Sequence, residues 1–165
     1  MIELDARLTE RIRIAEQPGP MRRVAAVLAH SGDSWFWLAG LCLLWWLGNE
    51  YWKRIAIIMI VSILLTALLV FVVKFTVRRR RPEGEWGQFY RSTDPHSFPS
   101  GHSVRAVMLA VVALGLGPIW LGLGLCIWAP LVALARVAMG VHYLSDILAG
   151  MLLGLLIGAV VLIVV

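Results

Sequence analysis

Three short groups of basic, histidine and acidic residues stand at the ends of the chain's long apolar runs. In chain order the groups are Lys74 with Arg81 and Pro82, then Pro99 to His102, then Arg136 with His142 and Asp146. Basic side chains bind phosphoryl oxygens, histidines transfer protons or act as nucleophiles, and a carboxylate can orient a histidine. If the fold brings the groups together, they could carry out phosphate chemistry at a membrane surface.

The first group pairs a lysine with an arginine, which together suit a dianionic ligand. Lys74 ends an apolar run, so its ammonium can reach the interface along its aliphatic stem. A continued helix would place Arg81 two turns further on the same face, while Pro82 turns Arg81 away from helical geometry. A guanidinium can bind two phosphate oxygens at once. The neighbouring arginines at 78–80 are interpreted instead as contacts to anionic lipid headgroups.

The second group precedes an apolar run and is typical of a helix start. Ser100 and Gly101 there would leave free backbone N–H groups and the positive end of the helix dipole for an anion. His102 could hand a proton to a leaving oxygen, since an imidazole titrates near neutrality. The alternative is a plain serine N-cap followed by an interfacial histidine.

The third group places a histidine and an aspartate one helical turn apart. If the last helix begins near His142, Asp146 lies on the same face and can accept a hydrogen bond from Nδ1–H, leaving Nε2 free to attack phosphorus. An aspartate that enters an apolar span is costly without a partner. Arg136, at the end of the preceding run, can stabilise charge on phosphoryl oxygens. The alternative is an Arg136–Asp146 pair that only joins two helices.

The composition predicts an all-α integral membrane protein. The chain has 165 residues, of which 60% are hydrophobic, and a mean hydropathy of +0.82. Residues 55–73 and 147–165 are uncharged runs long enough to span a bilayer. Residues 106–135 form a longer run that the Gly115 to Pro118 stretch should break into a hairpin, and residues 34–49 carry tryptophans near both ends. About five transmembrane helices are expected.

The first thirty residues differ in kind, because arginines and acids alternate there with apolar residues at four-residue spacing. This pattern predicts an amphipathic helix in the interface over residues 1–30, followed by the transmembrane bundle over 34–165. The chain as a whole, 1–165, is expected to form a single membrane-embedded domain. Five spans put all three groups on one membrane face. That face carries all of the 15 lysine and arginine residues except Lys53 and Arg54, which favours a cytoplasmic site.

Together the three groups resemble the signature of the type 2 phosphatidic acid phosphatase family, which shares its site with vanadium haloperoxidases. The family pattern is Lys-x6-Arg-Pro, then Pro-Ser-Gly-His, then Ser-Arg-x5-His-x3-Asp. This chain matches the pattern from Lys74 to Asp146 except at Ala135, which replaces the serine before Arg136. The departure is expected to weaken the support of Arg136 without abolishing activity. The short chain and small loop resemble the compact bacterial members.

The resemblance implies a role for each matching residue. His142 would be the nucleophile that forms a phosphohistidine, Asp146 would orient it, and His102 would protonate the departing alcohol and then activate water. The phosphoryl oxygens would be held by Lys74, Arg81, Ser100, the Gly101 backbone and Arg136. The family works without a metal or other cofactor, and this sequence has no clustered carboxylates for magnesium.

The resemblance predicts a membrane lipid phosphatase of a bacterial or archaeal cell membrane. Candidate substrates are polyprenyl phosphates or diphosphates, phosphatidylglycerol phosphate and phosphatidic acid, which would enter laterally from the bilayer. The expected partners are this lipid phosphate and membrane lipids, with no nucleic acid. Two alternatives are a lipid-phosphate-binding membrane protein without catalytic activity and a vanadate-dependent oxidase; the apolar bundle argues against the second because haloperoxidases are largely soluble.

Overall fold

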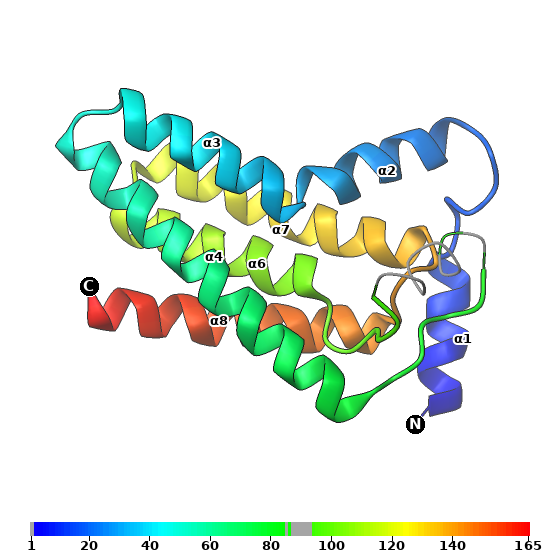
Figure 1. Ribbon diagram of the computed structural model, residues 1–165. Coiled ribbons are helices and arrows are strands. Elements are labelled where there is room, and N and C mark those ends of the chain that lie inside the picture. Colours follow the sequence, from blue (N-terminus) through cyan, green and yellow to red (C-terminus); the bar gives the residue numbers. More distant parts are fainter. Residues whose placement is uncertain (1, 85, 87–93) are drawn as a thin grey trace.

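The computed structural model describes residues 2–84, 86 and 94–165, which form a bundle of helices (Figure 1). The labelled helices are, in chain order, α1 (Ile2–Ile12), α2 (Pro20–Ser31), α3 (Ser34–Leu47), α4 (Glu50–Val77), α6 (Gly101–Leu116), α7 (Ile119–Ala138) and α8 (Leu144–Val164).

Three of these helices, α4, α7 and α8, are long and apolar enough to cross a membrane. The helices α3 and α6 are apolar but shorter, with 14 and 16 residues. These five helices coincide with the five expected spans. Their outward faces carry exposed leucines, valines and phenylalanines that would be costly in water and are stable against lipid. The all-helical, membrane-embedded fold predicted from composition is therefore confirmed.

The break within the long apolar run also lies where it was predicted. Helix α6 ends at Leu116 and α7 begins at Ile119. The amide of Gly117 donates a hydrogen bond to the carbonyl of Ala113 over 2.9 Å and closes the end of α6. Pro118 follows in an extended conformation, and because it has no N–H it costs nothing at the start of α7. The two helices therefore fold back on each other as a hairpin.

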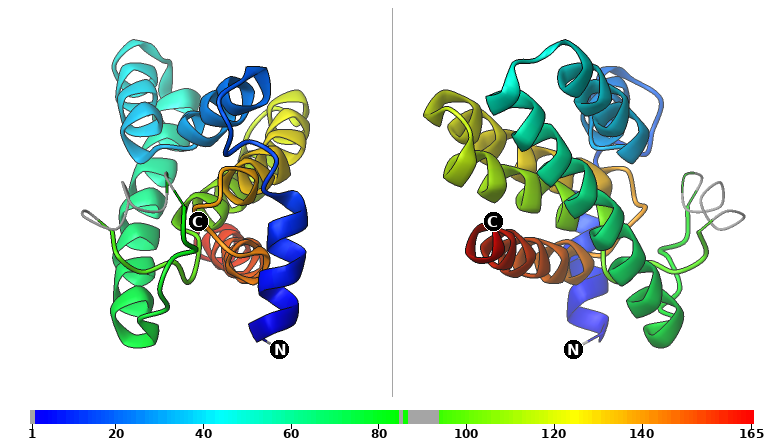
Figure 2. Two further views of the ribbon diagram at one scale, coloured as in Figure 1. Left: turned by 90° about the vertical axis from the view of Figure 1, so that its right-hand side faces the viewer. Right: turned by 60° about the vertical axis from the view of Figure 1, so that its left-hand side comes forward.

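Helix α6 lies at the centre of the bundle and packs against α4, α7 and α8 (Figures 1 and 2). Its contact with α8 is close because Gly150, Gly154 and Gly158 of α8 face it. A Cβ atom added at Gly154 would lie 2.3 Å from the carbonyl oxygen of Val104. Small residues at four-residue spacing let membrane helices approach in this way. The contact aligns the first turns of α6 and α8, which carry His102 and Asp146.

The N-terminal segment forms two helices rather than the single one expected over residues 1–30. Pro18, Gly19 and Pro20 follow α1 closely, and a proline-rich stretch cannot continue a helix. Figure 1 shows α1 running across the end of the bundle, whereas α2 packs on α7 with Ala25 and Ala29 buried. The interfacial position of this segment remains a prediction.

The connections alternate between the two ends of the bundle, as five spans require. The α3–α4 connection, the α6–α7 turn and the C-terminus share one end (Figure 1). There, Tyr51 donates a hydrogen bond to the carbonyl of Leu116 over 2.9 Å, and Arg54 donates one to the carbonyl of Val165 over 3.1 Å. The end of α4, the start of α6 and the α7–α8 junction lie at the opposite end. All three predicted groups are therefore at that opposite end.

Candidate active site

A polar cavity of about 430 Å³ lies at the end of the bundle where the three groups meet. Six of the eight predicted site residues line it: Lys74, Arg81, Gly101, His102, Arg136 and His142. The other lining residues are Asp33, Ser34, Trp35, Asp94 and Arg105. The two remaining predicted residues, Ser100 and Asp146, are fully buried behind the lining. The structure thus brings together predicted site residues that are separated by up to 72 positions, from Lys74 to Asp146.

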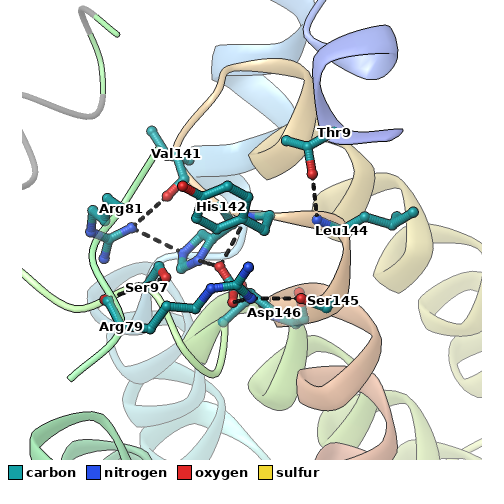
Figure 3. A network of polar contacts seen from close by, with 12 residues as sticks. Thr9, Arg79, Arg81, Ser97, Val141, His142, Leu144, Ser145 and Asp146 are labelled. Atoms are coloured by element: carbon teal, nitrogen blue, oxygen red, sulfur yellow. Dashed lines mark hydrogen bonds and ion pairs between the residues drawn. The ribbon is translucent and has the colours of Figure 1, made fainter. Parts of the chain in front are cut away.

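His142 lies between Arg81 and Asp146 (Figure 3). The Nη1 atom of Arg81 is 3.2 Å from Nε2 of His142. Because a guanidinium has only donors, Nε2 accepts this hydrogen bond, and a neutral ring then carries its proton on Nδ1. Nδ1 faces Oδ2 of Asp146 at 3.5 Å, which is an electrostatic contact longer than an ordinary hydrogen bond. The predicted nucleophile and its predicted orienting carboxylate therefore lie side by side, at a separation longer than that of the predicted hydrogen bond.

The surroundings of His142 keep its imidazole neutral. Burial lowers the pKa of His142 well below its usual range, and the positive charges of Arg81, Arg136 and Lys74 lower the pKa further. A neutral imidazole has a free electron pair on Nε2, which a nucleophile needs. The same three cations line the cavity, so the charges that repel a proton from His142 also make the position beside it favourable for an anion.

Asp94 occupies the space between the cations. Its Oδ2 accepts a hydrogen bond from Nη2 of Arg81 over 2.7 Å and a second hydrogen bond from Nζ of Lys74. The backbone carbonyl of Asp94 accepts another from Nε of Arg81 over 2.7 Å. One carboxylate oxygen thus binds the two cations predicted to hold a phosphoryl oxygen. Sequence reasoning missed Asp94; the available signal was an acidic residue close to the Pro99 to His102 group.

Arg81 lies outside helical geometry, as Pro82 predicts. Helix α4 ends at Val77, and Arg78 adopts a left-handed conformation with φ of 52°. The chain then runs extended, and Arg80 forms an antiparallel bridge with His96. Arg81 therefore reaches the cavity from an extended segment, where its Nη1 also donates a hydrogen bond to the carbonyl of Val141 over 2.9 Å.

The second group forms the start of α6 as predicted. Ser100 is the N-cap, and its hydroxyl accepts a hydrogen bond from the Ser103 amide over 3.5 Å. Gly101 lines the cavity as the first residue of the helix, so the positive end of the α6 dipole lies at the cavity wall. The serine therefore acts as a cap, while the glycine backbone is the part of this group that reaches the cavity.

His102 has an acidic partner that the sequence reasoning did not identify. Its Nε2 is 2.6 Å from Oδ1 of Asp33, and the other oxygen of Asp33 is 3.0 Å from Nδ1 of His30. Burial on its own would raise the pKa of Asp33, but the hydrogen bonds from His102 and His30 outweigh it and hold that pKa below its usual range. Asp33 is therefore an ionised carboxylate beside the predicted general acid.

Arg79 points into the protein, so its interpretation as a contact to lipid headgroups was wrong. Its guanidinium donates hydrogen bonds to Oδ1 of Asp146 over 2.7 Å and to Oδ2 of Asp5 over 2.5 Å. It also lies 4.0 Å from the ring centroid of Tyr143. Arg78 and Arg80 are exposed, whereas the Arg79 side chain is only 22% exposed. A run of four arginines hides this difference because nothing in the sequence marks the inward-facing one.

Ala135, the departure from the family pattern, packs away from the cavity. It is buried in a cluster of small apolar residues with Ala15, Ala25, Ala29 and Met139. A side chain at this position therefore contacts α2 and the segment after α1. In this structure the methyl group of Ala135 fills a gap between helices.

A family comparison agrees with the geometry. The model of the PAP2 superfamily matches residues 55–165. The chain belongs to the PAP2 superfamily. The matched stretch contains all eight predicted site residues, and it leaves out α1, α2, α3 and Asp33.

Several curated relatives have lipid phosphates in their names. An undecaprenyl-diphosphatase of Sulfolobus acidocaldarius is 32% identical over 131 residues, covering 77% of this chain and 62% of the relative. Phosphatidylglycerophosphatase B of Haemophilus influenzae is 31% identical over 81 residues, covering 44% of this chain and 34% of the relative. A decaprenylphosphoryl-5-phosphoribose phosphatase of Mycobacterium tuberculosis is 31% identical over 153 residues, covering 90% of this chain and 82% of the relative. The chain thus spans less than two thirds of the first two relatives.

Two solved structures have the same fold. A transmembrane PAP2-type phosphatidylglycerolphosphate phosphatase from Bacillus subtilis superposes with a TM-score of 0.79 at 25% identity, covering 97% of this chain and 83% of that one. Aquifex aeolicus LpxE superposes with a TM-score of 0.71 at 24% identity, covering 93% of each chain. The likeness extends over nearly the whole chain, including helices outside the stretch matched by the PAP2 family model.

Proposed function

We propose that this chain hydrolyses the phosphate monoester or diphosphate of a membrane lipid through a phosphohistidine at His142. The observation that carries the proposal is the buried, neutral His142, whose Nε2 faces a cavity lined by Lys74, Arg81 and Arg136. A dianionic phosphoryl group would replace the carboxylate of Asp94 in its contacts with two of these cations. The surrounding bundle is apolar, so the substrate would arrive from the bilayer.

The first half of the reaction transfers the phosphoryl group to the protein. Nε2 of His142 donates its electron pair to phosphorus as the bond from phosphorus to the ester oxygen breaks. Protonated His102 gives its proton to that departing oxygen. Asp146 stabilises the positive charge that develops on the His142 ring, and the three cations stabilise the phosphoryl oxygens.

The second half releases phosphate. His102, now neutral, accepts a proton from a water molecule as that water attacks the phosphohistidine. The phosphorus–nitrogen bond breaks, and its electron pair returns to Nε2 of His142. Because Lys74, Arg81 and Arg136 already supply three positive charges, we propose that the reaction needs no metal or other cofactor.

The test measures phosphate release by the purified protein in detergent, with a chelator present. The panel contains undecaprenyl diphosphate and monophosphate, phosphatidylglycerol phosphate and phosphatidic acid. At least one substrate should be turned over by the wild type, with acid-labile, base-stable ³²P on the protein after quenching. His142→Ala should show neither turnover nor label. Turnover that requires a divalent metal, or full activity of His142→Ala, would contradict the mechanism.

We also propose that the site faces the cytoplasm of a bacterial or archaeal cell. The basis is the excess of arginines at the site end, which includes the exposed Arg78 and Arg80 as well as those in α1 and α2. The test first replaces Cys42 and Cys126, which are both exposed, and then introduces Glu83→Cys or Glu50→Cys. An impermeant thiol reagent added to intact cells should label position 50. Labelling at position 83 alone would reverse the orientation.

A further inference from the structure

The junction between α2 and α3 contributes a carboxylate to the wall of the catalytic cavity. Asp33 lines this cavity together with His102, although it lies far from the three motifs in sequence and outside the stretch matched by the family model. Its two oxygens bind different histidines, His102 on α6 and His30 on α2. The carboxylate thus connects the proposed general acid to a second imidazole.

The junction is held firmly in this position. Arg105 of α6 donates a hydrogen bond from Nε to the carbonyl of Gly32 over 3.0 Å, and its Nη1 reaches the hydroxyl of Ser34. A Cβ atom added at Gly32 would lie 2.8 Å from Cγ1 of Val132 and 3.2 Å from Cδ2 of His102. The backbone on both sides of Asp33 is therefore fixed against α6 and α7. This fixes the Asp33 oxygen relative to the His102 ring.

The contact selects which nitrogen of His102 can work on the substrate. At 2.6 Å, ionised Asp33 accepts a hydrogen bond from Nε2–H of His102. The proton that is given to the leaving oxygen, and later taken from water, must then reside on Nδ1. Among the residues that the structure describes, Asp33, Arg105 and Arg136 are the charged groups that act on His102. Asp33 is the negative one, so it offsets two positive charges that oppose protonation of the ring.

We propose that Asp33 is a positioning residue that fixes the orientation of His102 and stabilises its protonated form, with His30 as the outer partner of the same carboxylate. This inference rests on the proposed phosphatase function. It assigns a role to the α2–α3 junction. This segment completes a catalytic site whose other parts come from α4 and the segment after it, α6, α7, the α7–α8 junction and α8. The α2–α3 junction thus acts on the acid step, whereas Asp146 acts on the nucleophile.

The test compares two leaving groups in the first half-reaction. An alkyl phosphate such as dodecyl phosphate leaves as a basic alkoxide that needs a proton, whereas p-nitrophenyl phosphate leaves as a stable phenolate. Single-turnover ³²P transfer to His142 is measured for the wild type, Asp33→Asn and Asp33→Glu. For the alkyl phosphate, the rate of transfer should be lower by about 10-fold or more in Asp33→Asn, and the rate in Asp33→Glu should lie between those of Asp33→Asn and the wild type. For p-nitrophenyl phosphate, the transfer rates of the three proteins should agree within about threefold.

The alkaline limb of the pH profile provides a second measurement. In Asp33→Asn, Arg105 and Arg136 still repel a proton from His102 while the carboxylate charge is gone. The protonated ring is then lost at lower pH, so the alkaline limb for the alkyl phosphate should move to lower pH. Glu50→Gln is the control, because it also removes a carboxylate charge, at the opposite end of the bundle, and removes no contact of His102. It should show neither the leaving-group dependence nor the pH shift.

Several outcomes would overturn the inference. Equal slowing of both substrates in Asp33→Asn, no slowing of either, or the same selective loss in Glu50→Gln would each do so. If Asp33→Asn does not fold, Asp33→Glu decides by the same comparison, since it displaces the oxygen and keeps the charge. A wild type that forms no phosphohistidine from any substrate would instead refute the proposed function itself, so the two failures are distinguishable.

Discussion

Arg79 joins Asp146 to Asp5, so the carboxylate behind the proposed nucleophile is bound to the N-terminal helix. Nη1 of Arg79 is 2.7 Å from Oδ1 of Asp146, and Nη2 is 2.5 Å from Oδ2 of Asp5 (Figure 3 shows the contact with Asp146). Asp146 also accepts a hydrogen bond from the amide of Tyr143 over 2.9 Å. The orientation of Asp146 toward His142 therefore depends on residues from three parts of the chain.

Replacing Arg79 by alanine should lower both the stability of the protein and its turnover rate. Asp146 is fully buried, and removing the partner of a buried charge costs about 3 to 5 kcal/mol. The check is thermal unfolding in detergent together with turnover. Arg80→Ala removes the same charge from an exposed neighbour and should change the free energy of unfolding by no more than about 0.5 kcal/mol. Equal effects of the two variants would contradict the role of Arg79.

Replacing Thr9 by valine should loosen α1 from α8. The hydroxyl of Thr9 accepts a hydrogen bond from the Leu144 amide over 3.0 Å, and Thr9 is buried. Valine keeps the shape but leaves this amide without its partner, which costs about 1 to 3 kcal/mol. Thr76→Val is the control, since that exposed hydroxyl bonds only within its own helix. Protease sensitivity of the segment before α2 should rise for Thr9→Val alone.

Replacing Gly154 by alanine should disrupt the α6–α8 contact. The added methyl group would overlap the carbonyl oxygen of Val104, and overpacking of this kind costs about 1 to 3 kcal/mol. Gly124→Ala is a matched control, because a Cβ there meets no atom within 4 Å. It should be neutral or stabilising, since alanine is the better helix former. Unfolding temperatures of the two variants measure the difference.

Introducing the family serine at Ala135 should not raise activity. The side chain at 135 packs against Ala25 and Ala29 rather than lining the cavity, so a hydroxyl gains no phosphate contact. We expect turnover within about twofold of the wild type and a loss of stability of about 1 kcal/mol. Higher turnover at unchanged stability would show that the hydroxyl reaches the site.

The buried neutral imidazole of His142 should make stability depend on pH. Its pKa is lowered well below 6.5 in the folded state, so between that lowered value and 6.5 the unfolded chain binds a proton that the folded chain does not. Stability attributable to His142 is therefore lost as pH falls below about 6.5, by up to about 1.4 kcal/mol per pH unit. The unfolding temperature of the wild type should fall more steeply from pH 7 to pH 5 than that of His142→Gln. Parallel curves would contradict the assignment.

The sequence by itself determined the five apolar helices and predicted six of the residues that line the cavity. The apolar runs have the length of membrane spans, and the Gly115 to Pro118 stretch breaks the longest of them, because these are local properties of the chain. The spacing of His142 and Asp146 likewise keeps them close, although α8 begins only at Leu144 and His142 lies just before this helix. These predictions were accurate because backbone hydrogen bonds within a span must be satisfied locally in lipid.

Only the tertiary structure decided which other charges belong to the site. Asp33 lies 69 positions from His102, and Arg79 lies 74 positions from Asp5. No local pattern distinguishes Arg79 from Arg80, or Asp33 from any capping aspartate. Their roles arise because the packing of α6 against α8, and of the α2–α3 junction against α6, leaves these side chains mostly buried. An ionised group buried there must be paired, and its partner is whichever opposite charge the fold brings within reach.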